Sequence, residues 1–225
     1  MTTTTSKTDT ASVAGSRVTR RSGPETSWNI SIKHSFYGST RLNTPNALVL
    51  TLTTFLAEWL IWIIPALIGI GWLRGNEGTR KTMLIATASG LMGLLINQLI
   101  GLTWSHPRPF MIGLGHTLIP HVADSSFPSD HLTLWWSVAL SFLLQQKLRR
   151  AGVALALLGA PIAWARIYLG VHFPLDMLGA IAVAALSAWL TLRAADWYLG
   201  PSYQLASGIH RRLFGRLITL GWVRD

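Results

Sequence analysis

The 225-residue chain contains no cysteine, so disulfide frameworks, zinc ribbons and thiol nucleophiles are excluded. Charge is also scarce, because Lys, Arg, Asp and Glu make up only 12% of the residues, about half the share of a typical soluble domain. Half of the residues are apolar, which excludes a disordered chain and a coiled coil. Acidic residues are the rarest charged group, with nine against 19 Lys and Arg, and the net charge is +10.

This basic excess has two readings. In a soluble protein it would indicate nucleic acid as the partner. In a chain this apolar, it instead favours loops that face anionic lipid, together with a site for an anionic substrate. We therefore expect membrane lipids as partners and no nucleic acid.

The apolar residues are concentrated in five blocks that hold one formal charge between them, Glu58. A helix of ~20 apolar residues spans a bilayer core, and the three shorter blocks reach that length with their flanks. Buried helices of a soluble bundle are the alternative, which five such blocks in one chain disfavour. The sequence predicts an all-α, polytopic membrane bundle of about five transmembrane helices plus interfacial helices. The blocks are residues 47–73, 82–104, 132–146, 151–165 and 177–192.

The short loops set the expected topology. Residues 74–81 and 147–150 are basic, as is the C-terminal tail, and positive loops stay in the cytoplasm. Five spans then place residues 105–128 and 171–174 together on the opposite side. Glu58 is expected either to pack inside the bundle or to line the path of the substrate.

The chain divides into four expected regions. Residues 1–26 are polar and have no apolar signal-peptide core, so we expect a disordered tail. Residues 27–46 predict an interfacial helix, or a sixth membrane-embedded element. Residues 47–200 form the expected transmembrane catalytic domain. Residues 201–225 predict a basic, amphipathic tail on the cytoplasmic surface.

Polar and charged residues cluster at the outer ends of the predicted spans, where such residues are costly and indicate function. Three short stretches from distant parts of the chain would meet at one membrane face. These residues are Arg108, Ser129, Asp130, His131, Arg166, His172 and Asp176.

The chemistry of this set favours phosphoryl transfer. Arg108 and Arg166 are permanent cations with planar forks suited to phosphate oxygens. Ser129 follows a proline at a predicted helix start, where a hydroxyl and free amides bind anions. Asp176 lies four residues after His172, close enough to fix one imidazole nitrogen and leave the other as a nucleophile.

His131 is then a second imidazole, suited to protonating a leaving oxygen. Together these residues predict covalent catalysis through a phosphohistidine, with charge stabilised by arginines and with no metal or other cofactor.

Four further outer-loop residues have spacings that fit no compact metal motif. They are His106, His116, His121 and Asp124.

The stretches HPRPF (106–110), FPSDH (127–131) and ARIYLGVHFPLD (165–176) resemble the three-part signature of the type 2 phosphatidic acid phosphatases. That signature reads Lys-x6-Arg-Pro, Pro-Ser-Gly-His and Ser-Arg-x5-His-x3-Asp. Within the family, the chain is similar to the bacterial undecaprenyl-diphosphatases of the BcrC type, through RPF, HVADSSFPSDH and VHFPLDMLG. The resemblance implies a helical core shared with haloperoxidases.

The resemblance also implies a role for each motif residue. His172 would be the nucleophile, Asp176 its support, and His131 the general acid. The phosphate would be bound by Arg108, Ser129 and Arg166.

Three positions depart from the family pattern, of which Ala165 in place of serine is a mild change and the other two matter. Gly101 stands where the pattern has its lysine, and Asp130 replaces the glycine before His131. Asp130 is an accessory candidate that is expected to pair with Arg108 or Arg166, or to raise the pKa of His131. His121 is the other accessory candidate, for shaping the loop or contacting a second phosphate.

The resemblance implies hydrolysis of undecaprenyl diphosphate in the bacterial inner membrane, at a site facing the periplasm or cell exterior. That reaction would recycle the lipid carrier of cell-wall synthesis and raise bacitracin resistance. One alternative is the same chemistry on phosphatidate, phosphatidylglycerophosphate or lipid A. Another is a non-catalytic protein that binds or transports polyprenyl phosphate, although two histidines at the site argue against simple binding.

Overall fold

The computed structural model describes residues 46–114 and 117–224. The expected tail over residues 1–26, nearly all of the expected interfacial segment 27–46, and His116 lie outside the described residues. Every regular element in the described part is helical. The elements are α2 (Ala47–Thr54), the π-helical turn η1 (Phe55–Trp59), the 3₁₀ turn η2 (Leu60–Trp62), α3 (Ile63–Arg74), α4 (Glu77–Thr103), η3 (Pro109–Ile112), α5 (Asp130–Leu143), η4 (Gln146–Leu148), α6 (Arg149–Tyr168), α7 (Pro174–Arg193) and α8 (Ala195–Thr219).

All five apolar blocks form helices, and within residues 46–114 and 117–224 four helical stretches are long and apolar enough to cross a membrane. The protein is therefore a multi-pass membrane protein, and the predicted all-α membrane bundle is confirmed. The four stretches are Ala47–Arg74, Glu77–Thr103, Gln146–Tyr168 and Pro174–Arg193.

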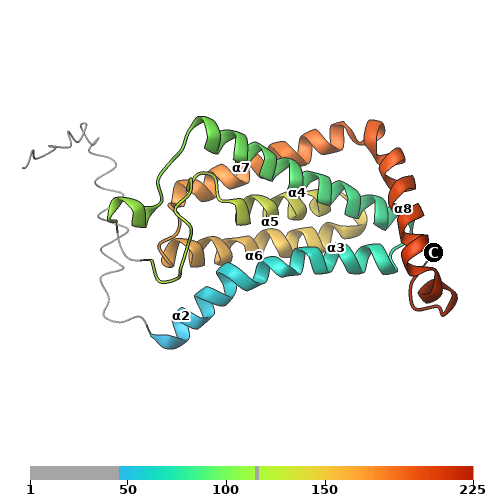
Figure 1. Ribbon diagram of the computed structural model, residues 1–225, viewed down its shortest axis with the longest axis horizontal. Helices are drawn as coiled ribbons and strands as arrows, with labels where there is room; N and C mark the ends of the chain where they lie inside the picture. Colours follow the sequence, from blue (N-terminus) through green and yellow to red (C-terminus); the bar gives the residue numbers. More distant parts are fainter. Residues whose placement is uncertain (1–45, 115–116, 225) are drawn as a thin grey trace, which may run out of the picture. The chain divides into compact units, whose positions relative to one another are not determined.

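The remaining block forms α5, which has only 14 residues. That length gives about 21 Å of helix, less than the ~30 Å of a bilayer core. Helices α4, α6 and α7 all pack against α5, so protein rather than lipid surrounds most of it (Figure 1). The chain before α5 forms a loop instead of further helix, and this loop contributes to the site described below.

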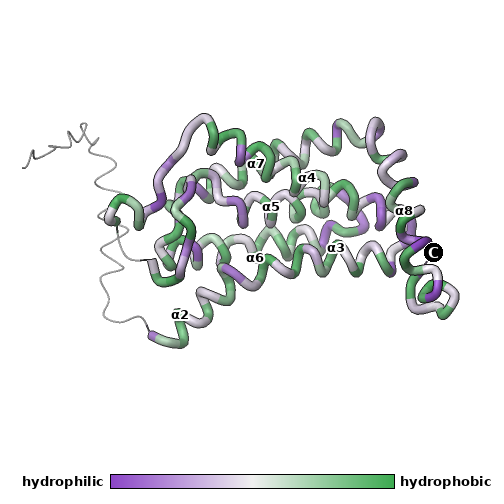
Figure 2. The backbone as a smooth tube through the Cα atoms, in the orientation of Figure 1, coloured by the Kyte–Doolittle hydropathy of each residue, from purple (hydrophilic) through white to green (hydrophobic). Residues whose placement is uncertain are grey.

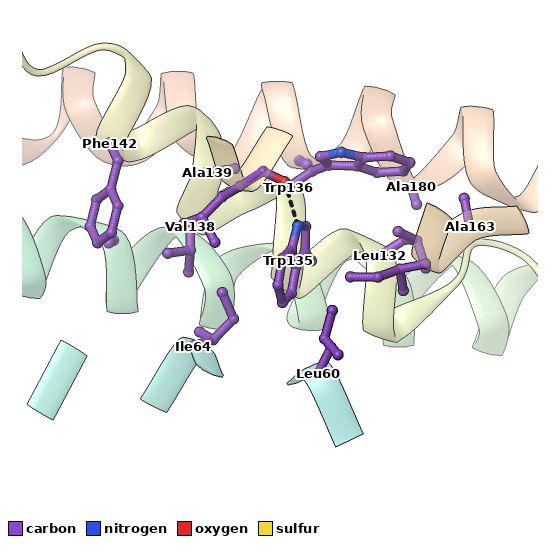
Figure 3. Close-up of a cluster of buried hydrophobic side chains, with 14 of the residues drawn as sticks. Leu60, Ile64, Leu132, Trp135, Trp136, Val138, Ala139, Phe142, Ala163 and Ala180 are labelled. Atoms are coloured by element: carbon purple, nitrogen blue, oxygen red, sulfur yellow. Dashed lines mark hydrogen bonds between the residues drawn. The ribbon is translucent and has the colours of Figure 1, made fainter. Parts of the chain in front are cut away.

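Side chains of α5 fill the centre of the bundle. Trp135 is completely buried, and its indole nitrogen donates a hydrogen bond of 2.7 Å to the carbonyl of Leu155 on α6. Leu60 and Ile64 reach the same cluster from the α3 side (Figure 3). Gly159 lets α6 approach α5 closely, because a Cβ there would overlap the Trp136 ring.

The outside of the bundle is apolar along the helices, and hydrophilic residues gather toward the two ends (Figure 2). On α4, four exposed leucines recur at helical spacing on one face. Such a face suits contact with lipid tails and leaves the ends to meet water. The leucines are Leu91, Leu95, Leu99 and Leu102.

Candidate active site

The seven residues expected to form the site come together at one end of the bundle. They lie on the loop between α4 and α5, at the start of α5, at the end of α6 and around the start of α7. Proline and an acidic side chain define the start of α7: Pro174 occupies its first turn, and the Asp176 carboxylate accepts a 2.8 Å hydrogen bond from the Phe173 amide.

His172 is 2% exposed and lies at the centre of the site. Its Nδ1 is 3.0 Å from the carbonyl oxygen of Ser126 and 3.1 Å from Oδ2 of Asp176. Both neighbours accept hydrogen bonds, so Nδ1 carries the ring proton and donates it. Asp176 is itself buried, and its Oδ2 also accepts a hydrogen bond from the Ser126 hydroxyl.

The opposite nitrogen of His172 faces two guanidinium groups. Nε2 lies 3.1 Å from Nη1 of Arg108 and 3.3 Å from Nη2 of Arg166. Guanidinium nitrogens only donate, so Nε2 is the acceptor and bears the lone pair. The tautomer required of a nitrogen nucleophile is thus built into the resting site.

The surroundings of His172 also keep the ring neutral. Burial lowers its pKa well below the usual value, and the charges of Arg166 and Arg108 lower it further. At neutral pH the Nε2 lone pair is consequently free of a proton.

The two arginines differ in what they leave available. The Nε of Arg108 donates to Oδ1 of the half-exposed Asp124 at 2.7 Å, and its Nη1 also donates to the Val171 carbonyl at 2.9 Å. Arg166 donates from Nη1 to the carbonyl of Ala57 at 3.0 Å, in the π-helical turn η1. The buried Nε of Arg166 has no hydrogen-bond partner within the described chain.

A second buried donor is also left open. Ser129 is fully buried at the N-cap of α5, but its hydroxyl neither caps the helix nor meets another described group. The first amides of α5 lie next to it, and free amides at a helix start bind anions. An unpartnered buried hydroxyl and an unpartnered guanidinium N–H favour an oxyanion ligand, since each is costly without one.

Two more imidazoles belong to this end. His131 is half-buried in the first turn of α5, within electrostatic reach of His172 and both arginines. His121 Nε2 lies 3.3 Å from Nη2 of Arg166, and its ring centroid is 6.3 Å from that of His172. Burial and the Arg108 charge lower the pKa of His121, so it too accepts rather than donates at Nε2.

Asp130 does not pair with either arginine, and burial with the charge of Arg166 lowers the pKa of His131 to about 3 instead of raising it, so both expectations for Asp130 were wrong. Its Oδ1 accepts a 2.8 Å hydrogen bond from Nδ2 of Asn97, and its Oδ2 lies 3.5 Å from Nε2 of Gln98. Both amides come from α4, which packs along the face of α5 that Asp130 occupies. Gly101, further along α4, has only Ser125 near the position of a Cβ.

Sequence reasoning missed three contributors to this site. They are the Ser126 hydroxyl and carbonyl, the Asn97 amide, and the Ala57 carbonyl. Ser126 falls within the HVADSSFPSDH stretch, three residues before Ser129, but that stretch does not indicate its contacts with His172 and Asp176. Residue type alone does not indicate Asn97 or Ala57. Among the residues that the structure describes, no group of three or more His, Cys, Asp or Glu is arranged to hold a metal ion.

The site is a buried histidine held between a carboxylate and two arginines in a helical membrane bundle, and the sequence assigns the chain to a family. Residues 82–198, over half of the chain, match the PAP2 superfamily, and the chain belongs to that superfamily. The predicted family is thereby confirmed.

Individual relatives match a larger share of the chain than the superfamily match does. The chain is 36% identical to undecaprenyl-diphosphatase BcrC of Bacillus subtilis (strain 168) over 176 residues, 78% of this chain and 90% of the relative. It is 37% identical to YbjG of Escherichia coli (strain K12) over 180 residues, 79% and 89% of the two chains. The crystal structure of Aquifex aeolicus LpxE shares the fold, with a TM-score of 0.60 at 20% identity, over 75% of this chain and 97% of that one.

Proposed function

We propose that this protein is an undecaprenyl-diphosphate phosphatase, which hydrolyses the lipid diphosphate to undecaprenyl phosphate and inorganic phosphate. One observation carries the proposal: the Nε2 lone pair of His172 faces two guanidinium groups, beside two buried donors that lack partners. The name of the relative in B. subtilis supports the choice of substrate.

In the first step, Nε2 of His172 attacks the terminal phosphorus, and the bond from phosphorus to the bridging oxygen breaks. The bridging oxygen leaves on undecaprenyl phosphate and takes a proton from His131, which takes up that proton from water when the negative diphosphate binds and offsets the burial and the arginine charges that lower its pKa. Arg108, Arg166, Ser129 and the α5 amides stabilise the charge on the three spectator oxygens.

In the second step, water attacks the phosphohistidine. His131, now without its proton, accepts one from the water, the N–P bond breaks, and inorganic phosphate leaves. Asp176 holds the proton on Nδ1 and stabilises the positive ring that exists between the two steps. The residues complete this cycle with no cofactor.

We place the protein in the plasma membrane of a bacterium, with the site on the outer face. Basic residues at the end of the bundle opposite the site support this orientation, including Lys147, Arg149 and Arg150 beside η4. Residues 47–200 are the catalytic domain and 201–225 the basic cytoplasmic tail in this proposal. The reaction would recycle the lipid carrier and increase bacitracin resistance.

Phosphate release tests the proposal. The purified protein in detergent is given undecaprenyl diphosphate with EDTA present, beside the His172→Ala variant. Release by the wild type and none by the variant is the expected result. Phosphatidate and phosphatidylglycerophosphate form parallel arms, and faster release from either of them would replace the proposed substrate. Release from none of the three by the wild type would contradict the phosphatase function.

A further inference from the structure

Ser126 lies outside the three motif segments, yet it touches both members of the His172–Asp176 pair. Its hydroxyl donates a hydrogen bond to Oδ2 of Asp176, and its carbonyl accepts one of 3.0 Å from Nδ1 of His172. The Ser126 hydroxyl oxygen is also 3.4 Å from Nδ1. The residue is completely buried, so water does not compete for these bonds.

The loop that carries Ser126 is held on both sides. The Ser126 amide donates a 2.7 Å hydrogen bond to the carbonyl of His106, and the Ser129 amide lies 3.4 Å from the carbonyl of Asp176. Three segments far apart in the sequence, around residues 106, 126 and 176, are thus tied together behind the imidazole. Ser126 contributes its amide, its hydroxyl and its carbonyl to the hydrogen bonds on this side of the ring.

We propose that Ser126 is a positioning residue that fixes the orientation and tautomer of the nucleophile. Its hydroxyl holds the Asp176 carboxylate, and its carbonyl shares the Nδ1 proton with that carboxylate. This proposal rests on the proposed phosphatase function and adds a residue to its machinery.

The position of Ser126 determines which kinetic constant it affects. It lies on the Nδ1 side of His172, while the arginines that would bind phosphate lie on the Nε2 side. Removing its hydroxyl should therefore slow the chemical step and leave substrate binding unchanged. Loss of one hydrogen bond to a charged group corresponds to a decrease in kcat of roughly 10- to 100-fold.

The neighbouring serine provides a matched control. The Ser125 hydroxyl accepts a hydrogen bond from the His106 amide at 3.2 Å and lies 3.4 Å from the carbonyl of Phe127. Both partners belong to the loop between α4 and α5, so the Ser125 hydroxyl stabilises that loop without touching His172 or Asp176. Ser126→Ala and Ser125→Ala each delete one hydroxyl from adjacent positions. We expect Ser126→Ala to lower kcat with KM unchanged, and Ser125→Ala to leave both within about twofold of the wild type.

A double-mutant cycle with Asp176→Asn tests how Ser126 acts. If the hydroxyl works through the carboxylate, Ser126→Ala should cost less than about twofold in kcat once Asp176 is already Asn. A purely structural role for Ser126 would give the same loss in both backgrounds. Single-turnover phosphate release from undecaprenyl diphosphate measures all four proteins.

Ser126→Cys provides a second variant in case the alanine protein fails to fold. A thiol fills the same space but is a weak donor, so kcat should fall as it does in Ser126→Ala. Wild-type kcat in a folded Ser126→Cys or Ser126→Ala protein would overturn the proposal and leave the phosphatase function standing. An inactive wild-type protein would overturn both.

Discussion

The two ends of the bundle each contain a buried histidine beside a buried arginine, and the two clusters differ in what they leave unsatisfied. At the site, His172 presents a lone pair to Arg108 and Arg166, and a guanidinium N–H and a serine hydroxyl have no described partner. At the other end, where α8 lies beside the start of α4 (Figure 1), His210 on α8 is 3.2 Å from Nη2 of Arg80.

The cluster around His210 is internally complete. Nδ1 of His210 accepts from the Trp72 indole at 3.2 Å, and Nε2 donates to the Arg224 carbonyl at 3.0 Å. Arg80 donates to the carbonyls of Trp72 and Arg224 at 2.9 and 2.6 Å. Every ring nitrogen has a protein partner, and no lone pair is directed at a free donor.

The comparison shows that burial of a histidine and an arginine does not by itself identify a catalytic centre. Both His172 and His210 are 2% exposed. The distinguishing feature is the direction of the hydrogen bonds: the lone pair of His172 faces two guanidinium groups, whereas both ring nitrogens of His210 bond within their own cluster. The His210 cluster holds the C-terminal turn against the α3–α4 end, whereas the His172 cluster leaves two buried donors, Ser129 Oγ and Arg166 Nε, without a described partner.

The largest difference should appear when each histidine is replaced by alanine. His172→Ala should lower phosphate release by at least ~10³-fold, since it removes the proposed nucleophile. His210→Ala should leave the rate within about twofold and lower the unfolding temperature, because Trp72 and Arg224 lose a buried partner. Turnover and thermal unfolding in the same detergent measure both effects. An inactive but fully stable His210→Ala protein would break the comparison.

Replacing Arg166 at the site, or Arg80 at the other end, by lysine should give the next largest difference in kcat/KM between the two ends. Arg166→Lys keeps the charge but loses the planar fork, and kcat/KM should fall by about 10²-fold. Arg80→Lys should lower the free energy of unfolding by ~1–3 kcal/mol, because two carbonyls lose a donor, while kcat/KM stays within about threefold. Steady-state kinetics and unfolding curves separate the two. Equal kinetic losses in both variants would contradict the assignment of Arg80 to structure.

Two buried serines test the open donors directly, since neither hydroxyl has a described partner. They are Ser129 at the site and Ser207 on α8. Ser129→Ala should lower kcat/KM by roughly tenfold, because a donor to the phosphate is lost. Ser207→Ala should not change the kinetics. Neither variant should unfold at a lower temperature, since each removes an unsatisfied buried group. Unchanged kinetics in Ser129→Ala would exclude its hydroxyl from phosphate binding.

The smallest effect concerns pH and stability. The pKa of His172 in the folded protein lies well below the value near 6.5 of an unfolded chain. Below pH 6.5 the His172 side chain binds a proton in the unfolded chain but not in the folded site. The free energy of unfolding should therefore decrease on acidification, with a slope of at most ~1.4 kcal/mol per pH unit.

His172→Gln removes this contribution, so its unfolding temperature should fall less steeply than that of the wild type between pH 7 and pH 5. The slope ends once the pH drops below the folded-state pKa, where both states bind the proton. Parallel curves for the two proteins would show that His172 takes up a proton equally well in the folded site.

Much of the architecture could be predicted from the sequence. Long uncharged apolar blocks are stable in a membrane as helices, because a helix satisfies its own backbone hydrogen bonds. The family followed from the three motif segments. The length of α5 did not follow, since apolar composition does not distinguish a helix that crosses lipid from a shorter one enclosed by its neighbours. Glu58, for which two roles were open, lies exposed on the π-helical turn η1.

Within the site, residue types that are costly in an apolar chain were recognisable, and the structure brings them to one end. Their hydrogen-bond partners were not. Asp130 carries a charge that suggested arginine, but the face of the helix it occupies meets the amides of Asn97 and Gln98. Ser126 is an ordinary loop residue until the fold brings it behind His172.

The sequence by itself determined that this chain is a helical membrane protein with histidine, arginine and aspartate at the ends of its apolar segments. This follows because hydrophobic length and scarce charge are properties of composition and spacing. Only the tertiary structure decided which nitrogen of His172 carries the lone pair and which buried donors are left without a described partner. Those outcomes depend on hydrogen bonds between side chains and carbonyls that are distant in the chain, and their directions exist only once the helices have packed.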